Sequence, residues 1–398
     1  MTRERLYLFD TTLRDGAQTN GVDFTLHDKQ LIAKMLDELG IDYVEGGYPG
    51  ANPTDTEFFV RKPDLAYARF TAFGMTRRPG RSVSNDPGLA ALLEARADAI
   101  CFVAKSSAYQ VRVALETTNE ENLASIRDSV KAAKSAGREV MLDCEHFFDG
   151  FKENAAFALS CAKAAYDSGA RWVVLCDTNG GTMPHEVEAI VTEVLKHIPG
   201  DHVGIHAHND TEQAVANSLA AVRAGVRQIQ GTLNGLGERC GNANLCSLIP
   251  TLRLKREFSD CFDIGVSPDK MATLMKVSRT LDDMLNRAPN RHAPYVGESA
   301  FVTKTGIHAS AVLKDPQTYE HVAPEAVGNR RKVLVSNQAG RSNVIAELER
   351  AGIAYEKNDS KLVRLVEELK EREATGYALL SGAIRFSCRV AIALSERL

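Results

Sequence analysis

Short apolar segments alternate with longer amphipathic ones along the chain, from residue 6 to about residue 255. Each short segment is nearly continuous in Val, Ile, Leu, Phe, Ala and Cys, which is typical of a parallel strand buried on both faces. We therefore expect eight strands, at Leu6–Asp10, Asp42–Gly46, Arg69–Gly74, Ala99–Ala104, Glu139–Cys144, Trp172–Cys176, Val203–His208 and Gln228–Leu233.

The longer segments place apolar side chains at helical spacing. Four of them end in glycine just before the next strand, where a helix end favours a left-handed backbone. These glycines are Gly40, Gly137, Gly169 and Gly225. The predicted helices include Thr25–Leu39, Glu121–Ala136, Glu153–Asp167, Pro184–His197, Thr211–Ala224 and Asn244–Leu254.

Eight repeats of strand and helix predict an α/β fold, either a closed barrel or an open doubly wound sheet. An open sheet usually carries the sequence G-x-G-x-x-G after its first strand. The first loop here reads DTTLRDG instead. We therefore predict a (β/α)₈ TIM barrel over residues 1–265, followed by smaller, mainly helical subdomains at 266–325 and 326–398.

The alternation stops after residue 255. Residues 268–285 and 343–373 are expected to be helical. Residues 286–297 are rich in Pro, Asn and His and predict a loop. The last stretch, Gly376–Leu398, shows no pattern that assigns it a packing partner.

Composition narrows the function only slightly. The net charge of −4 and the isoelectric point near 6.2 argue against a nucleic-acid-binding protein, which usually shows a basic face. No apolar stretch reaches the roughly 18 residues of a membrane helix, and the polar start of the chain does not resemble a signal peptide. The eight cysteines contain no C-x-x-C pair. We therefore expect reduced thiols in a cytoplasmic protein.

Polar residues follow the predicted strands, at the end where TIM-barrel enzymes carry their working groups. The strand interiors are apolar, so this asymmetry points to a site at one rim of the barrel. The residues are Arg14, Asp15, Glu45, Asp143, Glu145, His146, Asp177, Thr178, Asn179, His206, His208, Asn209, Asp210, Asn234, Glu238, Arg239 and Asn242.

His206 and His208 give the sharpest chemical signal among them. Positions i and i+2 of a strand point to the same side, so the two imidazoles could hold one divalent metal ion. Asp15 becomes their neighbour when the barrel closes, and Asn242 lies nearby. Two histidines and an aspartate leave coordination positions open, as catalytic sites do. The alternative is a pair of hydrogen-bonded histidines without a metal.

Arg14 and Glu145 are the candidates for acid–base and charge-stabilising roles. Beside a metal ion, Arg14 could stabilise an oxyanion or clamp a carboxylate; alternatively it only pairs with an acidic side chain. Glu145 is a candidate general acid or base, or a structural group. The glycine-rich segment NGLGERCGN leads into a helix whose start would suit an anion.

Three motifs together resemble the DRE-TIM metallolyase superfamily: LFDTTLRDGAQ, GIHAHND and NGLGERCGNANL. More narrowly, they resemble its acetyl-CoA-dependent condensing enzymes, the isopropylmalate, homocitrate and citramalate synthases. EGGYPGANPTDTEFF, DCEHFFDGFK, SAFVTKTGIHASAVLKDPQTYEH and VLVSNQAGRSN are similar to one group of bacterial citramalate synthases. The resemblance covers nearly the whole chain.

The resemblance implies a role for each matching position. Asp15, His206 and His208 would bind Mn²⁺, Mg²⁺, Co²⁺ or Zn²⁺. Asn242 would add a fourth contact or orient a bound water, and Thr178 would bind the carboxylate of a 2-oxo acid.

The catalytic groups implied by the resemblance come from two parts of the chain. Arg14 would stabilise the enolate or the alkoxide. Glu145 and His308 would share the removal of the acetyl proton, with the identity of the base left open, and Tyr319 would close over the same site. Related enzymes are homodimers, in which His308 would act on the partner's site.

The implied reaction joins acetyl-CoA, as co-substrate, to pyruvate and gives citramalate and CoA, in isoleucine biosynthesis. The alternatives are another 2-oxo acid acceptor, as in isopropylmalate or homocitrate synthases, a C–C lyase of the same superfamily, and a non-catalytic remnant. The motif TGIHAS belongs to the synthases, and the intact polar set argues against a remnant. Full-length relatives continue into a C-terminal regulatory domain; we expect this chain to lack it and to be insensitive to isoleucine.

Overall fold

The structure is a computed structural model that describes residues 3–334, 338, 340–356 and 360–375. The segment Gly376–Leu398, which contains Cys388, lies outside these residues. The chain divides into two compact units, residues 1–288 and residues 289–398. Each unit is described by itself.

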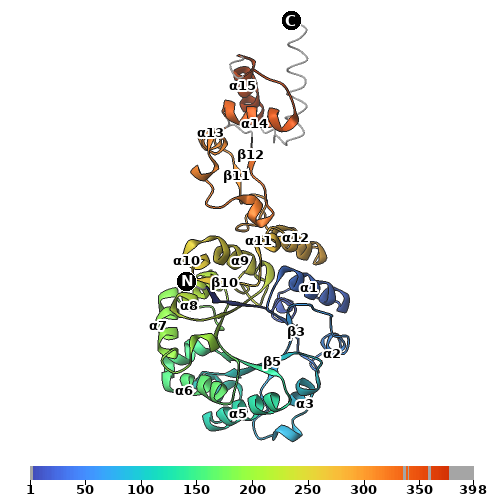
Figure 1. Cartoon of the computed structure of the whole chain (residues 1–398), viewed down its shortest axis with the longest axis vertical. Helices are drawn as coiled ribbons and strands as arrows, with labels where there is room; N and C mark the ends of the chain where they lie inside the picture. The colour runs from blue at the N-terminus through green and yellow to red at the C-terminus, as the bar shows by residue number, and fades with distance from the viewer. Residues whose placement is uncertain (1–2, 335–337, 339, 357–359, 376–398) are drawn as a thin grey trace. The chain divides into compact units, whose positions relative to one another are not determined.

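Eight parallel strands of the first unit close into a barrel, which confirms the predicted (β/α)₈ fold and excludes the open sheet. Figure 1 shows the strands surrounded by a ring of helices. All eight predicted strands are present, with ends that differ by at most two residues. They are β2 (Tyr7–Asp10), β3 (Tyr43–Gly47), β4 (Arg69–Met75), β5 (Ala99–Lys105), β6 (Glu139–Glu145), β7 (Trp172–Asp177), β8 (Val203–Ala207) and β9 (Gln228–Gly231).

The barrel closes between its first and last strands. β2 pairs with β3 on one side and with β9 on the other, in the register Tyr7 to Gln228 and Asp10 to Gly231. The polar residues that follow β2, β8 and β9 therefore meet at one rim, as the sequence predicts.

Helices follow the strands around the barrel. They are α1 (Leu26–Leu39), α2 (Pro53–Val60), α3 (Pro87–Glu94), α4 (Ala108–Ala114), α5 (Asn119–Ser135), α6 (Phe147–Asp167), α7 (Pro184–Val194), α8 (Ala214–Ala224), α9 (Leu245–Leu254) and α10 (Arg256–Ser259). The helix expected from Glu153 begins six residues earlier, because Phe147 and Phe148 are fully buried and anchor an extra stretch. Asn154 leaves helical geometry (φ −150°, ψ 84°) and divides α6 in two.

A layer of large side chains fills the barrel near the start of its strands. Tyr43, Trp172 and Met141 belong to this buried cluster. The Trp172 indole donates to the Tyr43 hydroxyl at 3.1 Å, and Tyr43 donates to Glu139 at 2.6 Å. Large apolar groups thus occupy the interior at that end, and the polar groups gather at the opposite end.

Two further helices belong to the first unit and lie within residues 268–285, which the sequence predicts to be helical. They are α11 (Pro268–Met271) and α12 (Leu274–Met284). Asn234, which follows β9, donates to the Ser278 carbonyl at 2.9 Å and to Asp282 at 3.1 Å, so α12 is tied to the rim loop. A short parallel pair, β1 (Glu4–Arg5) with β10 (Phe262–Asp263), completes this unit.

The second unit contains a two-stranded parallel sheet and three α-helices among its described residues. These are β11 (Val302–Thr303), α13 (Gly306–Lys314), β12 (Lys332–Val333), α14 (Arg341–Ala351) and α15 (Ser360–Ala374). The single helical stretch expected at 343–373 is two helices, because Gly352 ends α14 in the left-handed conformation (φ 68°). Val344, Leu348, Leu362, Leu365 and Leu369 form the apolar core between them.

The described residues include no membrane-spanning helix and no disulfide. No described helix combines the length and apolar composition that crossing a membrane requires. The described cysteines are all unpaired thiols, and five of the seven are buried, whereas Cys240 and Cys261 are exposed.

Candidate active site and metal centre

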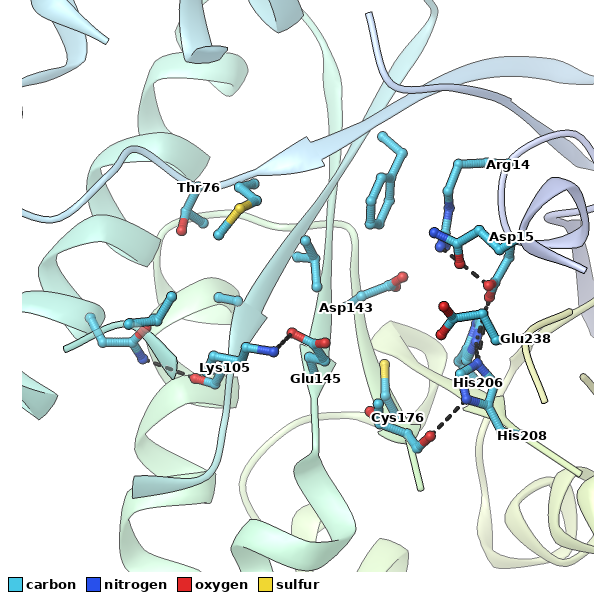
Figure 2. Close-up of a pocket in the computed structure, with 18 residues that line it drawn as sticks. Arg14, Asp15, Thr76, Lys105, Asp143, Glu145, Cys176, His206, His208 and Glu238 are labelled. Atoms are coloured by element: carbon cyan, nitrogen blue, oxygen red, sulfur yellow. Dashed lines mark hydrogen bonds and ion pairs between the residues drawn. The ribbon is translucent and has the colours of Figure 1, made fainter. Parts of the chain in front are cut away.

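A cavity of about 330 Å³, lined by polar and apolar side chains, opens at the carboxyl ends of the barrel strands. Its volume suits a small substrate. Figure 2 shows Arg14, Asp15, His206 and His208 gathered on one side of this cavity, and Lys105 paired with Glu145 on the other. Eight of the rim residues predicted from the sequence line it: Arg14, Asp15, Asp143, Glu145, Thr178, His206, His208 and Glu238.

Asp15, His206 and His208 converge on one point. Asp15 Oδ2 lies 3.1 Å from His206 Nε2 and 3.6 Å from His208 Nε2, and the two Nε2 atoms are 3.1 Å apart. Adjacent ligands of one ion, each bound at about 2.1 Å, have such separations. All three side chains are buried, so a cation would be shielded from water there. The residues present therefore fit a divalent metal ion.

The ring nitrogens of the two histidines support the same conclusion. His208 Nδ1 lies 2.7 Å from the carbonyl oxygen of Thr178, which can only accept a hydrogen bond. Nη2 of Arg239, which can only donate, also lies 2.9 Å from this nitrogen. A proton on His208 Nδ1, with the lone pair on Nε2 that a metal needs, therefore agrees with the Thr178 contact but not with the Arg239 contact. His206 Nδ1 likewise faces an acceptor, Oε1 of Gln230, at 2.8 Å.

Asn242 lies beside this cluster with its amide nitrogen inward. Nδ2 donates to Asp15 Oδ2 at 2.8 Å and lies 3.2 Å from His206 Nε2. Oδ1 of Asn242 is buried without a partner, and a Cβ on Gly237 would lie 1.8 Å from it. The nitrogen, rather than the oxygen, faces the metal-ligand atoms, so a fourth ligand contact from Asn242 needs a half-turn of the amide.

The charges around Asp15 favour a cation at this point. Burial alone would raise the pKa of Asp15, but Arg14 and the two imidazoles outweigh burial and hold it well below its usual value. Asp15 is therefore a carboxylate. Burial lowers the pKa of His206, yet the carboxylate of Asp15 outweighs that effect and the net change is upward. The cluster thus attracts positive charge, whether it arrives as a proton or as a metal ion.

Glu45 holds Arg14 in place. Arg14 Nε donates to Glu45 Oε2 at 2.8 Å, and the guanidinium stacks over Phe73 at 3.8 Å from the ring centroid. Glu45 is completely buried, and its second oxygen has no hydrogen-bond partner. Burial raises the pKa of Glu45 to about 7, with Asp143 adding to this rise and Arg14 opposing it. Sequence reasoning noted Glu45 only as a strand-end residue and assigned it no role.

Lys105 is a cavity residue that sequence reasoning missed. Its Nζ lies 2.6 Å from Glu145 Oε2. The two residues end the neighbouring strands β5 and β6, where they are register partners. Its position at a strand end was the available signal, since the other polar residues were found in that way. The ion pair fixes the Glu145 carboxylate at the cavity wall.

Thr178 can donate a hydrogen bond into the cavity. Its hydroxyl oxygen accepts a hydrogen bond from the backbone N–H of His146 at 2.8 Å. The hydroxyl hydrogen is then free to donate to an anionic group in the cavity.

His308 and Tyr319 belong to the second unit, where the structure brings them together. Their rings lie 4.4 Å apart at an angle of 37°. His308 is on α13, and both side chains are exposed in this unit.

Comparisons with known proteins agree with the barrel fold and with the cluster of Asp15, His206 and His208. Residues 5–280 match the family described as HMGL-like, and residues 295–376 match one described as homocitrate synthase post-HMGL domain-like. The (R)-citramalate synthase of Aquifex aeolicus is 50% identical over 94% of this chain and 70% of its own length. The 2-isopropylmalate synthase of Sulfolobus acidocaldarius is 33% identical over 95% of this chain and 93% of its own. The crystal structure of Bacillus subtilis HMG-CoA lyase, at 20% identity, aligns with a TM-score of 0.61 over 73% of this chain and 98% of the lyase, a likeness of fold.

Proposed function

The chain belongs to the HMGL-like family, and from that membership we propose that it condenses acetyl-CoA with pyruvate to give (R)-citramalate and free CoA. The observation that carries this proposal within the structure is the buried cluster of Asp15, His206 and His208 beside Arg14. A buried cation site next to a guanidinium is suited to substrates whose oxygens gain negative charge during the reaction.

The residues around the cavity suggest how the acceptor is held. Asp15, His206 and His208 would hold a divalent ion such as Mn²⁺, Mg²⁺, Co²⁺ or Zn²⁺, which supplies Lewis acidity toward the keto group of the 2-oxo acid. The Thr178 hydroxyl donates to the substrate carboxylate. Because Glu45 and Phe73 fix the Arg14 guanidinium, it is positioned to stabilise an oxyanion without moving.

The condensation requires a base, a carbon–carbon bond and a hydrolysis. Glu145 takes a proton from the acetyl methyl group, and the resulting enolate attacks the keto carbon of pyruvate. Arg14 stabilises the oxygen that gains charge as the bond forms. That alkoxide then takes a proton from solvent, and Glu145 releases to solvent the proton it removed. Water then cleaves the thioester to release CoA. His308 remains a second candidate for the base, with Tyr319 beside it.

Pyruvate is the acceptor that the comparisons favour. The citramalate synthase shares half of its aligned residues with this chain, and the isopropylmalate synthase shares a third. Acceptors of the two differ in a side chain of a few carbons, and one methylene changes binding by only about 1–3 kcal/mol. The acceptor must therefore be measured.

The test is release of free thiol from acetyl-CoA across a panel of 2-oxo acids, with Mn²⁺ or Mg²⁺ and with EDTA. Release with pyruvate that EDTA abolishes, and that His206→Ala lacks, supports the proposal. Release with 2-oxoisovalerate or 2-oxoglutarate instead would keep the reaction type and change the acceptor. If no acceptor supports release from folded, metal-loaded protein, the condensing function is wrong.

We also propose a homodimer in which His308 serves the partner's site, on the resemblance to related enzymes. Light scattering measures the mass in solution. Mixing an Arg14→Ala protein with a His308→Ala protein tests the shared site, because a mixed dimer would carry one intact set of groups. A monomeric mass, or a mixture without recovered activity, would contradict this arrangement.

A further inference from the structure

One of the two histidines is connected to a buried glutamine and aspartate that do not belong to the metal-ligand cluster. His206 Nδ1 lies 2.8 Å from Oε1 of Gln230, and Nε2 of Gln230 donates to Asp143 Oδ1 at 2.9 Å. Gln230 is completely buried, and Asp143 is only 3% exposed. The three residues lie on β8, β9 and β6, and β9 is not a neighbour of β6 in the barrel. The connection therefore crosses the barrel interior.

The donor and acceptor atoms of each group determine where the hydrogens lie in these two hydrogen bonds. Burial raises the pKa of Asp143, but the Oδ1 atom that faces Gln230 accepts a hydrogen bond from the Gln230 amide nitrogen. The amide oxygen of Gln230 therefore faces His206, and it can only accept. Nδ1 of His206 must then carry the proton, which leaves the lone pair on Nε2, 3.1 Å from Asp15.

We infer that Gln230 is a positioning residue, which fixes the tautomer and ring orientation of His206 for metal binding. Gln230 does not line the cavity, so it acts through His206. The inference rests on the metal centre of the proposed function. Partners that receive the second ring N–H of a metal-binding histidine typically contribute 10- to 100-fold to metal affinity.

At His208, the acceptor near Nδ1 is a backbone carbonyl, whereas at His206 it is a side chain. His208 Nδ1 lies 2.7 Å from the backbone carbonyl of Thr178, an acceptor that no side-chain substitution removes, and 2.9 Å from Nη2 of Arg239, which is not an acceptor. The tautomer of His206, by contrast, depends on Gln230, and a single substitution can change it. A neutral imidazole without such a partner can place its proton on Nε2, where it blocks coordination.

Gln228 provides a matched control on the same strand. It lies two residues before Gln230, so its side chain points to the same side, and it is also completely buried. Its amide nitrogen lies 3.7 Å from the sulfur of Met141, and its amide oxygen is buried without a partner. Replacing Gln228 removes a buried amide of equal size without touching a histidine.

The experiment measures the affinity of the metal-free protein, residues 1–398, for Mn²⁺ by titration calorimetry. Gln230→Leu should bind Mn²⁺ 10 to 100 times more weakly than wild type, whereas Gln228→Leu should stay within about twofold. Circular dichroism melts check that both variants fold. Equal affinity of Gln230→Leu and wild type would overturn the inference. If wild type itself bound no metal, the metal centre, and with it the proposed function, would be wrong.

A double substitution separates positioning from packing. Gln230→Glu together with Asp143→Asn keeps both hydrogen bonds, because the new amide can donate to the new carboxylate and that carboxylate still accepts from His206 Nδ1. This protein should bind Mn²⁺ at least as tightly as wild type, since a carboxylate is the stronger acceptor. If it binds as weakly as Gln230→Leu, Gln230 acts only through packing and the inference is wrong.

Discussion

Replacing Arg14 by methionine should abolish condensation. Near neutral pH, however, it should lower the free energy of unfolding by less than the loss of one partner of a buried ion pair usually does. Breaking a buried ion pair by removing one partner typically destabilises a protein by about 3–5 kcal/mol. Glu45, the partner, is completely buried. However, its pKa is already raised to about 7, because burial outweighs Arg14. Glu45 can therefore take up a proton when Arg14 is lost.

The sign of the pH dependence follows from this raised pKa. Below pH 7 the Glu45 carboxyl is neutral both in wild type and in Arg14→Met. The ionisation of Glu45 therefore contributes little to the difference in free energy of unfolding between the two proteins. Above pH 7 Glu45 of wild type ionises beside Arg14. In the variant, which lacks Arg14, the pKa of Glu45 is higher still and Glu45 stays protonated. The stability difference should therefore grow by about 1.4 kcal/mol for each pH unit above 7. A Glu45→Gln background removes the ionisable group, so Arg14→Met in that background should show no such slope.

Activity and stability are measured separately in this cycle. Loss of one oxyanion-stabilising donor lowers kcat by about 10²–10³, so both proteins that lack Arg14 should be nearly inactive in citramalate formation. Urea unfolding at pH 6, 7 and 8 gives the stability difference. The reasoning is refuted if Arg14→Met keeps its activity within tenfold of wild type. It is also refuted if the pH slope survives in the Glu45→Gln background.

Three further outcomes are expected. Glu145→Gln should lower kcat by about 10²–10⁴ with unchanged Mn²⁺ affinity in calorimetry; normal kcat would exclude Glu145 as the base. Wild type should gain about 2.7 kcal/mol of stability at Mn²⁺ 100-fold above Kd, and His206→Ala should gain none in the same melts. Burial raises the pKa of Asp10 to about 7 against two Thr12 hydrogen bonds. Because Glu45 titrates in the same range, wild type should lose up to about 4 kcal/mol more stability than Asp10→Asn as pH rises from about 4 to 7, and equal losses in the two proteins would contradict this assignment.

Local sequence pattern was enough to place the barrel and most of its rim. Largely apolar runs located every strand of the barrel to within two residues, because strands buried on both faces are mostly apolar. The i and i+2 spacing of His206 and His208, with Asp15 on the first strand, predicted a cluster whose atoms indeed converge.

The partners of these groups could not be predicted in the same way. Glu45 supports Arg14 from 31 positions away, and Gln230 reaches Asp143 across 87 positions. Such pairs depend on strand register and on which side chains meet across the interior, and no local pattern contains either. The early start of α6 has a similar cause, since the burial of Phe147 and Phe148 is a tertiary effect.

The candidate metal ligands lie on the two sides of the seam where the barrel closes. Asp15 follows the first strand and His206 lies on the seventh, 191 positions along the chain by their numbers. Closing a flexible loop of that length costs roughly 5 kcal/mol of chain entropy. A bound ion would therefore cross-link the segments near the first and last strands and so stabilise the closed barrel. Depletion of the ion should accelerate amide hydrogen exchange first in β2, β8 and β9, while β5 and β6, opposite the seam, stay protected.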